Sequence, residues 1–302
     1  MKGHLRQASL ALALTAIPLT AIVANGQTPS WRASVDSALG RKGTVQPDSV
    51  YKFGLPRSDL TVAVGSVNLR PALALGSWVA FLPVSRSESV VMGDLVLTEG
   101  EIAAVMRVLQ AGGVEQTALH NHLRGETPHV MYMHIMAHGN PVTIARTIRT
   151  ALAETGTPPA PGSATSTAAA IDLDTAGVAR ALGRSGKING GVYQVSVPRA
   201  EVIREGAIVI PPSMGVATAI NIQPTGGGRV VATGDFVLRP AEVNPVIRAL
   251  RSHGIEVTAL HSHMIDESPR LFFMHFWGDG EALAVAGGLR AALDATNSQR
   301  AK

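Results

Sequence analysis

Six of the ten histidines in this 302-residue chain occupy matched positions in two copies of one motif. The first copy, residues 117–134, reads TALHNHLRGETPHVMYMH, and the second, residues 258–275, reads TALHSHMIDESPRLFFMH. Imidazole nitrogens bind zinc, copper or ferrous iron, and three histidines leave positions open for water or a substrate. We therefore predict that the motifs hold a divalent transition metal, with zinc favoured and copper or iron as alternatives. The predicted ligands are His120, His122 and His134 in the first copy and His261, His263 and His275 in the second.

A β-hairpin would bring the three histidines of each copy onto one face of a sheet. Side chains alternate along a strand, so His120 and His122 point the same way. If the hairpin centres near Thr127, His134 lies opposite His120 and Tyr132 lies opposite His122. The alternative is that each imidazole is an ordinary hydrogen-bonded sheet residue. The corresponding pairs in the second copy are His275 with His261 and Phe273 with His263.

Each hairpin loop also contains a glutamate two residues before a proline. These are Glu126 and Glu267, which we predict as the catalytic residues. A carboxylate beside a histidine-bound metal could be a fourth ligand, or a general base acting on bound water, whose pKa zinc lowers to about 7. The alternative is a solvated loop acid. Asp266 occurs only in the second loop, so the second copy is the better candidate for chemistry.

Two further acids, Asp94 and Asp235, occupy matched positions in the segments GDLVL and GDFVL. Each could orient a histidine by accepting a hydrogen bond from its second ring nitrogen. A role at a strand start or β-bulge beside Gly93 or Gly234 is the favoured interpretation.

Both motifs belong to a longer internal duplication. VYKFGLPR at residues 50–57 returns as VYQVSVPR at residues 192–199. Arg57 and Arg199, which end these segments, are expected to form surface salt bridges rather than to bind an anionic substrate. The predicted division is a first repeat at residues 27–153, a linker rich in Pro, Ala, Ser and Thr at 154–170, and a second repeat at 171–302.

The local patterns predict strands, a helix, the histidine hairpin and a closing helix in each repeat. Strands are expected at residues 60–67, 78–84 and 90–97. Thr98 and Glu101 form a capping box for the next helix, and Pro240 begins its counterpart. This order predicts an α+β fold in which each repeat is a mainly antiparallel sheet with two helices on one face. Because the other face of each sheet is apolar, we expect the repeats to pack as a pseudo-twofold pair.

The first 26 residues have the layout of a secretory signal peptide, with a basic start, an apolar run and small residues. A membrane anchor at the N-terminus is the alternative. Cleavage would remove Lys2 and Arg6 and lower the net charge from +4 to +2, and no cluster of basic and aromatic residues indicates nucleic acid. The chain has no cysteine, which excludes disulfides and thiolate ligands. We predict export to the periplasm or the exterior, without stable membrane insertion.

The duplicated pattern VY..PR, GD.VL, TALH.H and P...MH resembles the LppY/LpqO-type family of secreted bacterial proteins, which are built around a domain of unknown function. The resemblance covers nearly the whole chain after the predicted signal peptide. It implies secretion and a shared fold, and it brings no activity with it. Lipoprotein members carry a cysteine after the signal peptide, so the lack of cysteine here excludes a lipid anchor.

The leading hypothesis is an exported two-repeat protein that binds one or two metal ions through its histidine hairpins. As a hydrolase or lyase it would use the metal as a Lewis acid or hydroxide source on a small polar substrate. The alternatives are a non-catalytic envelope protein that binds metal or a small ligand, and a structural envelope protein whose histidines are metal-free. The sequence contains no P-loop, dinucleotide-binding fingerprint, GxSxG motif or HExxH motif. The catalytic chemistries that these motifs indicate are therefore not predicted.

Overall fold

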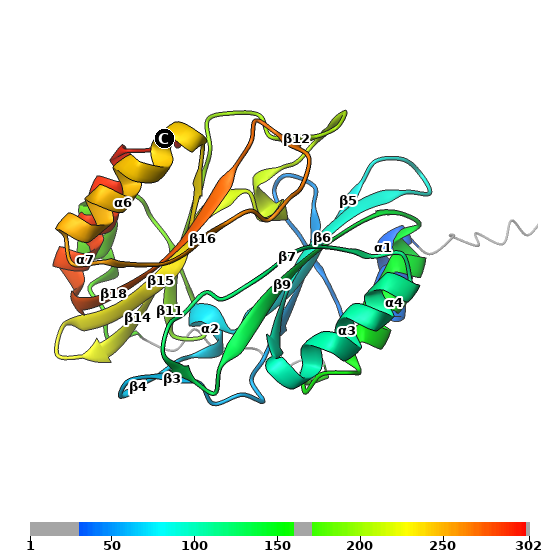
Figure 1. The fold of residues 1–302 in the computed structure, drawn as a ribbon, viewed down its shortest axis with the longest axis horizontal. Helices are drawn as coiled ribbons and strands as arrows, with labels where there is room; N and C mark the ends of the chain where they lie inside the picture. Colours follow the sequence, from blue (N-terminus) through cyan, green and yellow to red (C-terminus); the bar gives the residue numbers. More distant parts are fainter. Residues whose placement is uncertain (1–29, 160–170, 300–302) are drawn as a thin grey trace, which may run out of the picture.

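A computed structural model of the chain describes residues 30–159 and 171–299, and these form two similar repeats, each with a six-stranded antiparallel sheet (Figure 1). The α+β class and the duplication predicted from the sequence are therefore confirmed. The predicted signal peptide, residues 1–26, and residues 160–170 of the predicted linker lie outside the described residues. Within the described part of the chain, no helix combines the length and apolar character needed to cross a lipid bilayer.

The strands and the longer helices follow the same order in both repeats. In the first repeat they are α1 (Trp31–Leu39), β1 (Thr44–Val45), β2 (Tyr51–Pro56), β3 (Ala63–Val64), β4 (Val67–Asn68), α2 (Pro71–Ala74), β5 (Gly76–Pro83), β6 (Ser89–Thr98), α3 (Glu99–Ala111), β7 (Glu115–His120), β8 (Glu126–Thr127), β9 (Val130–Gly139) and α4 (Pro141–Leu152). In the second they are α5 (Thr175–Leu182), β10 (Lys187–Asn189), β11 (Val192–Pro198), β12 (Arg204–Glu205), β13 (Ile208–Val209), η1 (Pro212–Met214), β14 (Ala217–Gly226), β15 (Arg229–Leu238), η2 (Pro240–Glu242), α6 (Val243–Ser252), β16 (Glu256–His261), β17 (Glu267–Ser268), β18 (Phe272–Glu281) and α7 (Ala282–Asp294).

Each main sheet carries the histidine hairpin at one edge. The strand orders are β1-β2-β5-β6-β9-β7 and β10-β11-β14-β15-β18-β16. Two small sheets, β4-β3-β8 and β13-β12-β17, hold the hairpin loops. The strand predicted at residues 60–67 is instead the pair of two-residue strands β3 and β4, because its backbone pairs with the loop strand β8 and not with the main sheet.

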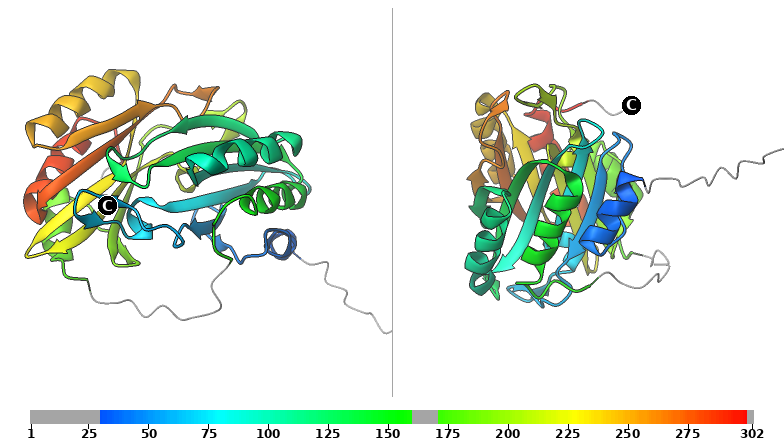
Figure 2. Two further views of the ribbon diagram at one scale, coloured as in Figure 1. Left: turned by 60° about the horizontal axis from the view of Figure 1, so that its bottom comes forward. Right: turned by 90° about the vertical axis from the view of Figure 1, so that its right-hand side faces the viewer.

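Helices cover the outer face of each main sheet, and the inner faces of the two sheets meet (Figures 1 and 2). Strand β6 shows why. Val91 and Leu95 join the core beneath the helices, whereas Val90 and Met92, which alternate with them, pack against residues of the second repeat. Three helices cover each sheet rather than the predicted two, because the first helix of each repeat also packs into this core, as Val35 of α1 does.

Polar caps begin the helices near the predicted positions. The Thr98–Glu101 capping box is present at the start of α3. The side chain of Asn140 accepts hydrogen bonds from the amides of Val142 and Thr143 and so caps α4. Pro240 opens a 3₁₀ turn, η2, and α6 follows it directly.

A buried arginine joins the end of β2 to the start of α3. Arg57 is 1% exposed and donates to both carboxylate oxygens of Glu101, at 2.8 and 2.9 Å, and to Asp59 and the carbonyl of Val96. The predicted salt bridge is present, but its predicted place on the surface is wrong. We call this arrangement the arginine clamp. Its counterpart in the second repeat consists of Arg199, Glu242, Glu201 and the carbonyl of Val237.

Reciprocal hydrogen bonds fix the two repeats about an approximate twofold axis. Thr117 Oγ1 donates to the carbonyl of His263, and the equivalent Thr258 Oγ1 donates to the carbonyl of His122, both at 2.6 Å. Apolar side chains from both inner faces surround these contacts. One mixed cluster includes Ala80, Met92, Val237 and Phe273, and the other includes Val96, Tyr132, Val192 and Val231. The predicted pseudo-twofold packing is therefore confirmed.

Candidate metal centre

All six predicted histidine ligands meet in one cluster between the two sheets. Each His-x-His pair begins at the last residue of an edge strand, β7 or β16, and the third histidine lies in the neighbouring strand, β9 or β18. The two predicted three-histidine faces are not separate sites, because the inner faces that carry them are packed against each other. The ring centroids across the interface are 3.6 Å apart for His120 and His261, 3.7 Å for His122 and His275, and 3.5 Å for His134 and His263.

The hairpin register differs from the predicted one by two residues. His120 lies opposite Tyr132, and His134 lies opposite Ala118. In the second repeat His261 lies opposite Phe273. A shift of two residues keeps every side chain on its predicted face, so the histidines still converge. Between the two strands, the loop forms its own strand, β8, and the chain rejoins the main sheet at β9.

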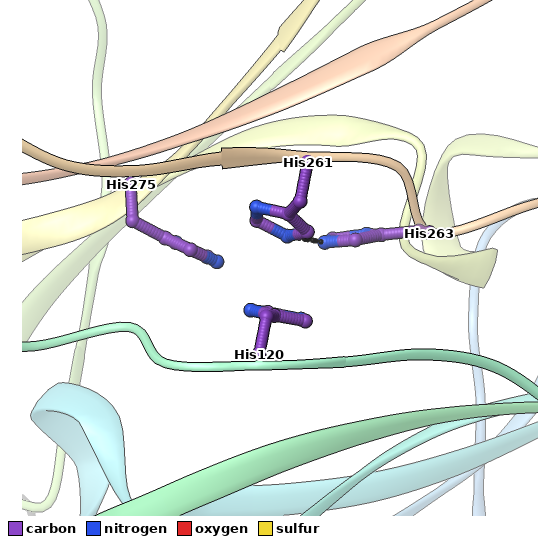
Figure 3. Close-up of side chains that lie close together, drawn as sticks. All are labelled: His120, His261, His263 and His275. Atoms are coloured by element: carbon purple, nitrogen blue, oxygen red, sulfur yellow. Dashed lines mark hydrogen bonds between the residues drawn. The ribbon is translucent and has the colours of Figure 1, made fainter.

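The ring nitrogens form two overlapping groups whose candidate ligand atoms lie within 4.8 Å of one another. His120, His261, His263 and His275 form the first group, which we call the four-histidine group. Figure 3 shows its rings pointing toward one another, three from the second repeat and His120 from the first. The second group consists of His120, His122 and His134, so His120 belongs to both.

Backbone contacts orient two of these rings as metal ligands. The Nδ1 atom of His275 lies 2.8 Å from the carbonyl of Gly234, and that of His120 lies 3.2 Å from the carbonyl of Asn121. A ring N–H that donates to a carbonyl leaves Nε2 with a free lone pair. Both Nε2 atoms are buried and have no hydrogen-bond partner. This is the tautomer and orientation expected of a histidine that binds metal through Nε2.

The remaining pair of the four-histidine group is in direct contact. The Nε2 atoms of His261 and His263 are 2.8 Å apart, so one of them must carry the proton that joins them. A metal ion bound at both nitrogens would replace that proton.

Asp94 lies beside the histidines of its own repeat. Its Oδ2 atom is 3.8 Å from His122 Nε2 and 3.9 Å from His134 Nε2. Its Oδ1 atom is buried without a hydrogen-bond partner. Asp235 has the equivalent place, with Oδ2 at 3.4 Å from His263 Nε2 and Oδ1 at 3.7 Å from His275 Nδ1.

The favoured interpretation of these aspartates, a strand start or bulge, is wrong. Asp94 and Asp235 lie in the middle of β6 and β15, where the pairing with both neighbouring strands is regular. Gly93 and Gly234 are required for a different reason. A Cβ atom at either position would collide with a carbonyl oxygen of the adjacent strand. Glycine thus permits close strand pairing, and the next residue directs a carboxylate into the cluster.

Burial keeps the histidines neutral. Desolvation is the main cause that lowers the pKa of His120 to about 4 and that of His275 to about 3. Desolvation, with repulsion from neighbouring imidazoles, also lowers the pKa of the other four histidines well below the usual value. Neutral imidazole is the form that binds metal. Burial likewise raises the pKa of Asp94 to about 7, against the opposing charge of Lys52, and raises that of Asp235 well above its usual range.

The predicted catalytic residues, Glu126 and Glu267, secure the hairpin loops. Glu126 Oε1 lies 2.6 Å from His129 Nδ1, and Glu267 Oε1 accepts a hydrogen bond of 2.8 Å from the amide of Leu271. Both side chains are fully buried, so the solvated-acid interpretation is wrong. Neither glutamate belongs to the two histidine groups. Their role as bases stays a prediction.

Lys52 is a residue near the cluster that the sequence analysis missed. Its Nζ atom donates to the carbonyl of Ser213 at 3.0 Å and lies 3.9 Å from the centre of the Trp78 ring. Burial lowers its pKa to about 8. The matched residue of the second repeat is Gln194, so the mismatch between VYKF and VYQV was the available signal.

Comparison with known proteins gives a family and no activity. A family model described as "Domain of Unknown Function (DUF1259)" matches residues 33–154 and, a second time, residues 176–295. The solved structure of EtuB from Clostridium kluyveri is 13% identical, with 83% of this chain and 88% of that chain covered and a TM-score of 0.19. A trimeric bacterial microcompartment shell protein, PduB, is 14% identical, with 82% and 88% covered and a TM-score of 0.19. At these TM-scores, neither similarity supports a conclusion about the fold or the function of this chain. No curated protein matches the chain.

Proposed function

This chain belongs to the DUF1259 family, and we propose that its two repeats together bind a divalent transition metal ion, zinc above all, at the four-histidine group. The observation that carries the proposal is the set of buried ring nitrogens without hydrogen-bond partners, which includes His120 Nε2 and His275 Nε2. Buried polar atoms in folded proteins are nearly always paired, so several unpartnered imidazole nitrogens in one place support a cation-binding site.

The chemistry of the group fits zinc. Four neutral imidazoles can surround zinc as a tetrahedron with Zn–N bonds of about 2.0–2.1 Å. Copper and ferrous iron also accept imidazole, so metal analysis must decide among them. The charge of the ion would offset those of Asp94 and Asp235, which are otherwise costly to bury.

The ligands come from both repeats, so a bound ion would join them. Binding to the folded state alone adds about 2.7 kcal/mol of stability when the free metal is at about 100 times its Kd. Metal should therefore raise the unfolding temperature of the whole chain, not of one repeat.

A double variant tests the proposal. His261→Ala with His263→Ala removes two ligands and the contact between them, and His138→Ala, on an exposed histidine of β9, is the matched control. Metal-stripped wild type and the control should each bind one zinc tightly and melt at a higher temperature with it. The double variant should lose more than about 100-fold in affinity, since second-sphere partners alone contribute about 10–100-fold. If wild type takes up no stoichiometric metal and its melting is unaltered by zinc or copper, the histidines are a metal-free structural cluster.

A second candidate is a metal-dependent hydrolase or lyase that acts on a small polar substrate, with Glu126 or Glu267 as the base. The observation that favours it is Glu126 Oε2, a buried carboxylate oxygen without a partner in the loop after the His-x-His pair. Glu126→Gln should abolish turnover and keep the metal if the carboxylate is a base. Loss of metal affinity would make it a ligand, and full activity would exclude it from the reaction.

We also propose export of the protein. The signal-peptide layout of residues 1–26 and the resemblance to LppY/LpqO-type proteins support it. Cell fractionation, with N-terminal sequencing of the mature protein, should find it outside the cytoplasm and cleaved near Ala24 or Gly26.

A further inference from the structure

The two histidine groups compete for one residue. His120 belongs to both, but its Nδ1 atom already faces the carbonyl of Asn121, so only Nε2 is available for a metal. One nitrogen binds one ion. When His120 completes the four-histidine group, His122 and His134 remain as two buried imidazoles whose Nε2 atoms have no partner.

Asp94 supplies a third donor at that position. Its Oδ2 atom is nearly equidistant from the two orphaned nitrogens, at 3.8 and 3.9 Å. The side chain is nearly fully buried, and its Oδ1 atom is also unpartnered. Neighbouring ligand atoms around an ion with bonds of about 2.0–2.2 Å are separated by about 2.8–3.6 Å, so Asp94 Oδ2 would move toward each of these nitrogens by about 0.2–1 Å on metal binding.

The equivalent carboxylate of the second repeat is not placed in the same way. Both histidines nearest to Asp235, His263 and His275, are already members of the four-histidine group. Its Oδ1 atom faces His275 Nδ1, the nitrogen that is engaged with the carbonyl of Gly234. Asp235 therefore has no free pair of imidazoles.

We propose that Asp94, His122 and His134 form a second metal site, distinct in chemistry from the four-histidine site beside it. The assignment of His120 to the first site rests on the function proposed above. Two imidazoles and one carboxylate with open coordination positions suit ferrous iron or manganese(II) rather than a closed zinc site. The open positions are where water or a small oxygen-donor ligand would bind.

Manganese(II) is the probe that tests the second site. Wild type is first loaded with one equivalent of zinc and then titrated with manganese(II), whose free six-line electron paramagnetic resonance signal decreases on binding. Asp94→Asn removes the negative charge of the proposed ligand with little change in shape, and Asp279→Asn, on an exposed aspartate of β18, is the matched control. Circular dichroism verifies that each variant is folded, and His122→Ala serves as a second test of the same site.

Zinc-loaded wild type and Asp279→Asn should each bind one further equivalent of manganese. Asp94→Asn and His122→Ala should bind it at least about tenfold more weakly while they retain zinc. The proposal is overturned if wild type takes up no manganese, if Asp94→Asn binds it as wild type does, or if Asp279→Asn weakens binding as much as Asp94→Asn does. The proposed function would fail in a different measurement, namely if zinc affinity were the same in wild type and in the His261→Ala/His263→Ala variant. In that case the second site is still tested by comparing the manganese affinity of zinc-free wild type with that of zinc-free Asp94→Asn.

Discussion

The two repeats match where the fold is held together and differ where the histidine cluster is surrounded. The arginine clamp has equivalent partners in both repeats: Arg57 pairs with Glu101, and Arg199 pairs with Glu242. The surroundings of the cluster differ, by contrast. Lys52 of the first repeat corresponds to Gln194 in the second repeat. One scaffold therefore carries two halves of the histidine cluster whose surroundings are not chemically equivalent.

The aromatic residues that support the cluster differ as well. Tyr132 stacks on His122 with ring centroids 3.3 Å apart, and Phe273 stacks on His263 at 3.6 Å. The hydroxyl of Tyr132 donates to the carbonyl of Ala74 at 2.9 Å, a bond that a phenylalanine cannot form. Stacking is thus common to both halves, whereas the polar contact behind it belongs to the first half alone.

The largest expected effect comes from breaking the clamps. Arg57→Met and Arg199→Met each leave two carboxylates near a buried, unpaired position, and loss of one partner of a buried ion pair costs about 3–5 kcal/mol of unfolding free energy. Because the clamps have the same partners, the two variants should lose similar amounts in urea unfolding. The control Arg86→Met, in an exposed turn, should change stability by less than about 0.5 kcal/mol. If one of the two arginine variants lost less than about 1 kcal/mol of unfolding free energy and the other lost the expected amount, the two clamps would not be equivalent.

Acid should weaken both clamps in the same direction. Burial alone would raise the pKa of Glu101 and Glu242, but hydrogen bonds from the arginines and nearby amides outweigh it and lower the pKa of both groups below 4.5. The unfolded chain then binds protons more readily, so the contribution is complete above about pH 4.5 and is lost as the pH falls through the lower folded values. Urea midpoints measured from pH 7 downward should fall less steeply for Glu101→Gln and for Glu242→Gln than for wild type. A difference between these two slopes would break the equivalence.

Lys52→Gln copies the second repeat into the first and sharpens the contrast between the half-sites. The charge of Lys52 stabilises the Asp94 carboxylate and opposes a second cation beside it. Its removal should tighten manganese binding at Asp94 by about two- to tenfold, measured by titration. Lys187→Gln, on the exposed strand β10, should leave the affinity unchanged. Weaker binding in Lys52→Gln would mean that the lysine holds Asp94 in position instead.

The smallest expected effect belongs to Tyr132→Phe. The variant loses the hydrogen bond to Ala74 and keeps the ring on His122, so unfolding should be easier by about 0.5–1.5 kcal/mol with unaltered metal affinity. Metal affinity that falls with the hydroxyl would show that this bond also orients His122.

Local features were predictable from the sequence because they depend on neighbouring residues. The capping box at Thr98, the closing helices and the face occupied by each histidine follow from short spacings. The register of the hairpin did not follow, because β8 pairs with β3, more than 60 residues away. Nor did the burial of Arg57, since its partner Glu101 lies 44 positions further along the chain.

The merging of two histidine triads into one cluster depends on contacts between repeats. Strand alternation shows that His120 and His122 share a face, but not which surface that face meets. The sequence contains two matched histidine motifs, and the simplest interpretation of these motifs is two separate, equivalent metal sites. Only the packing of the two inner faces brings the ring centroids of His120 and His261 to 3.6 Å apart, and that packing depends on apolar residues spread over both repeats.

The reciprocal hydrogen bonds of Thr117 and Thr258 bear on how such a protein can arise. A single repeat has the partners for both bonds, but it could form them only with a second copy of itself, as a symmetric homodimer. In that ancestor every substitution near the axis would appear twice, so a lysine at position 52 would bring a second buried lysine with it. Fusion of the duplicated genes removes this constraint. In the linked chain, the residues of one half of the cluster can then change while those of the other half stay the same.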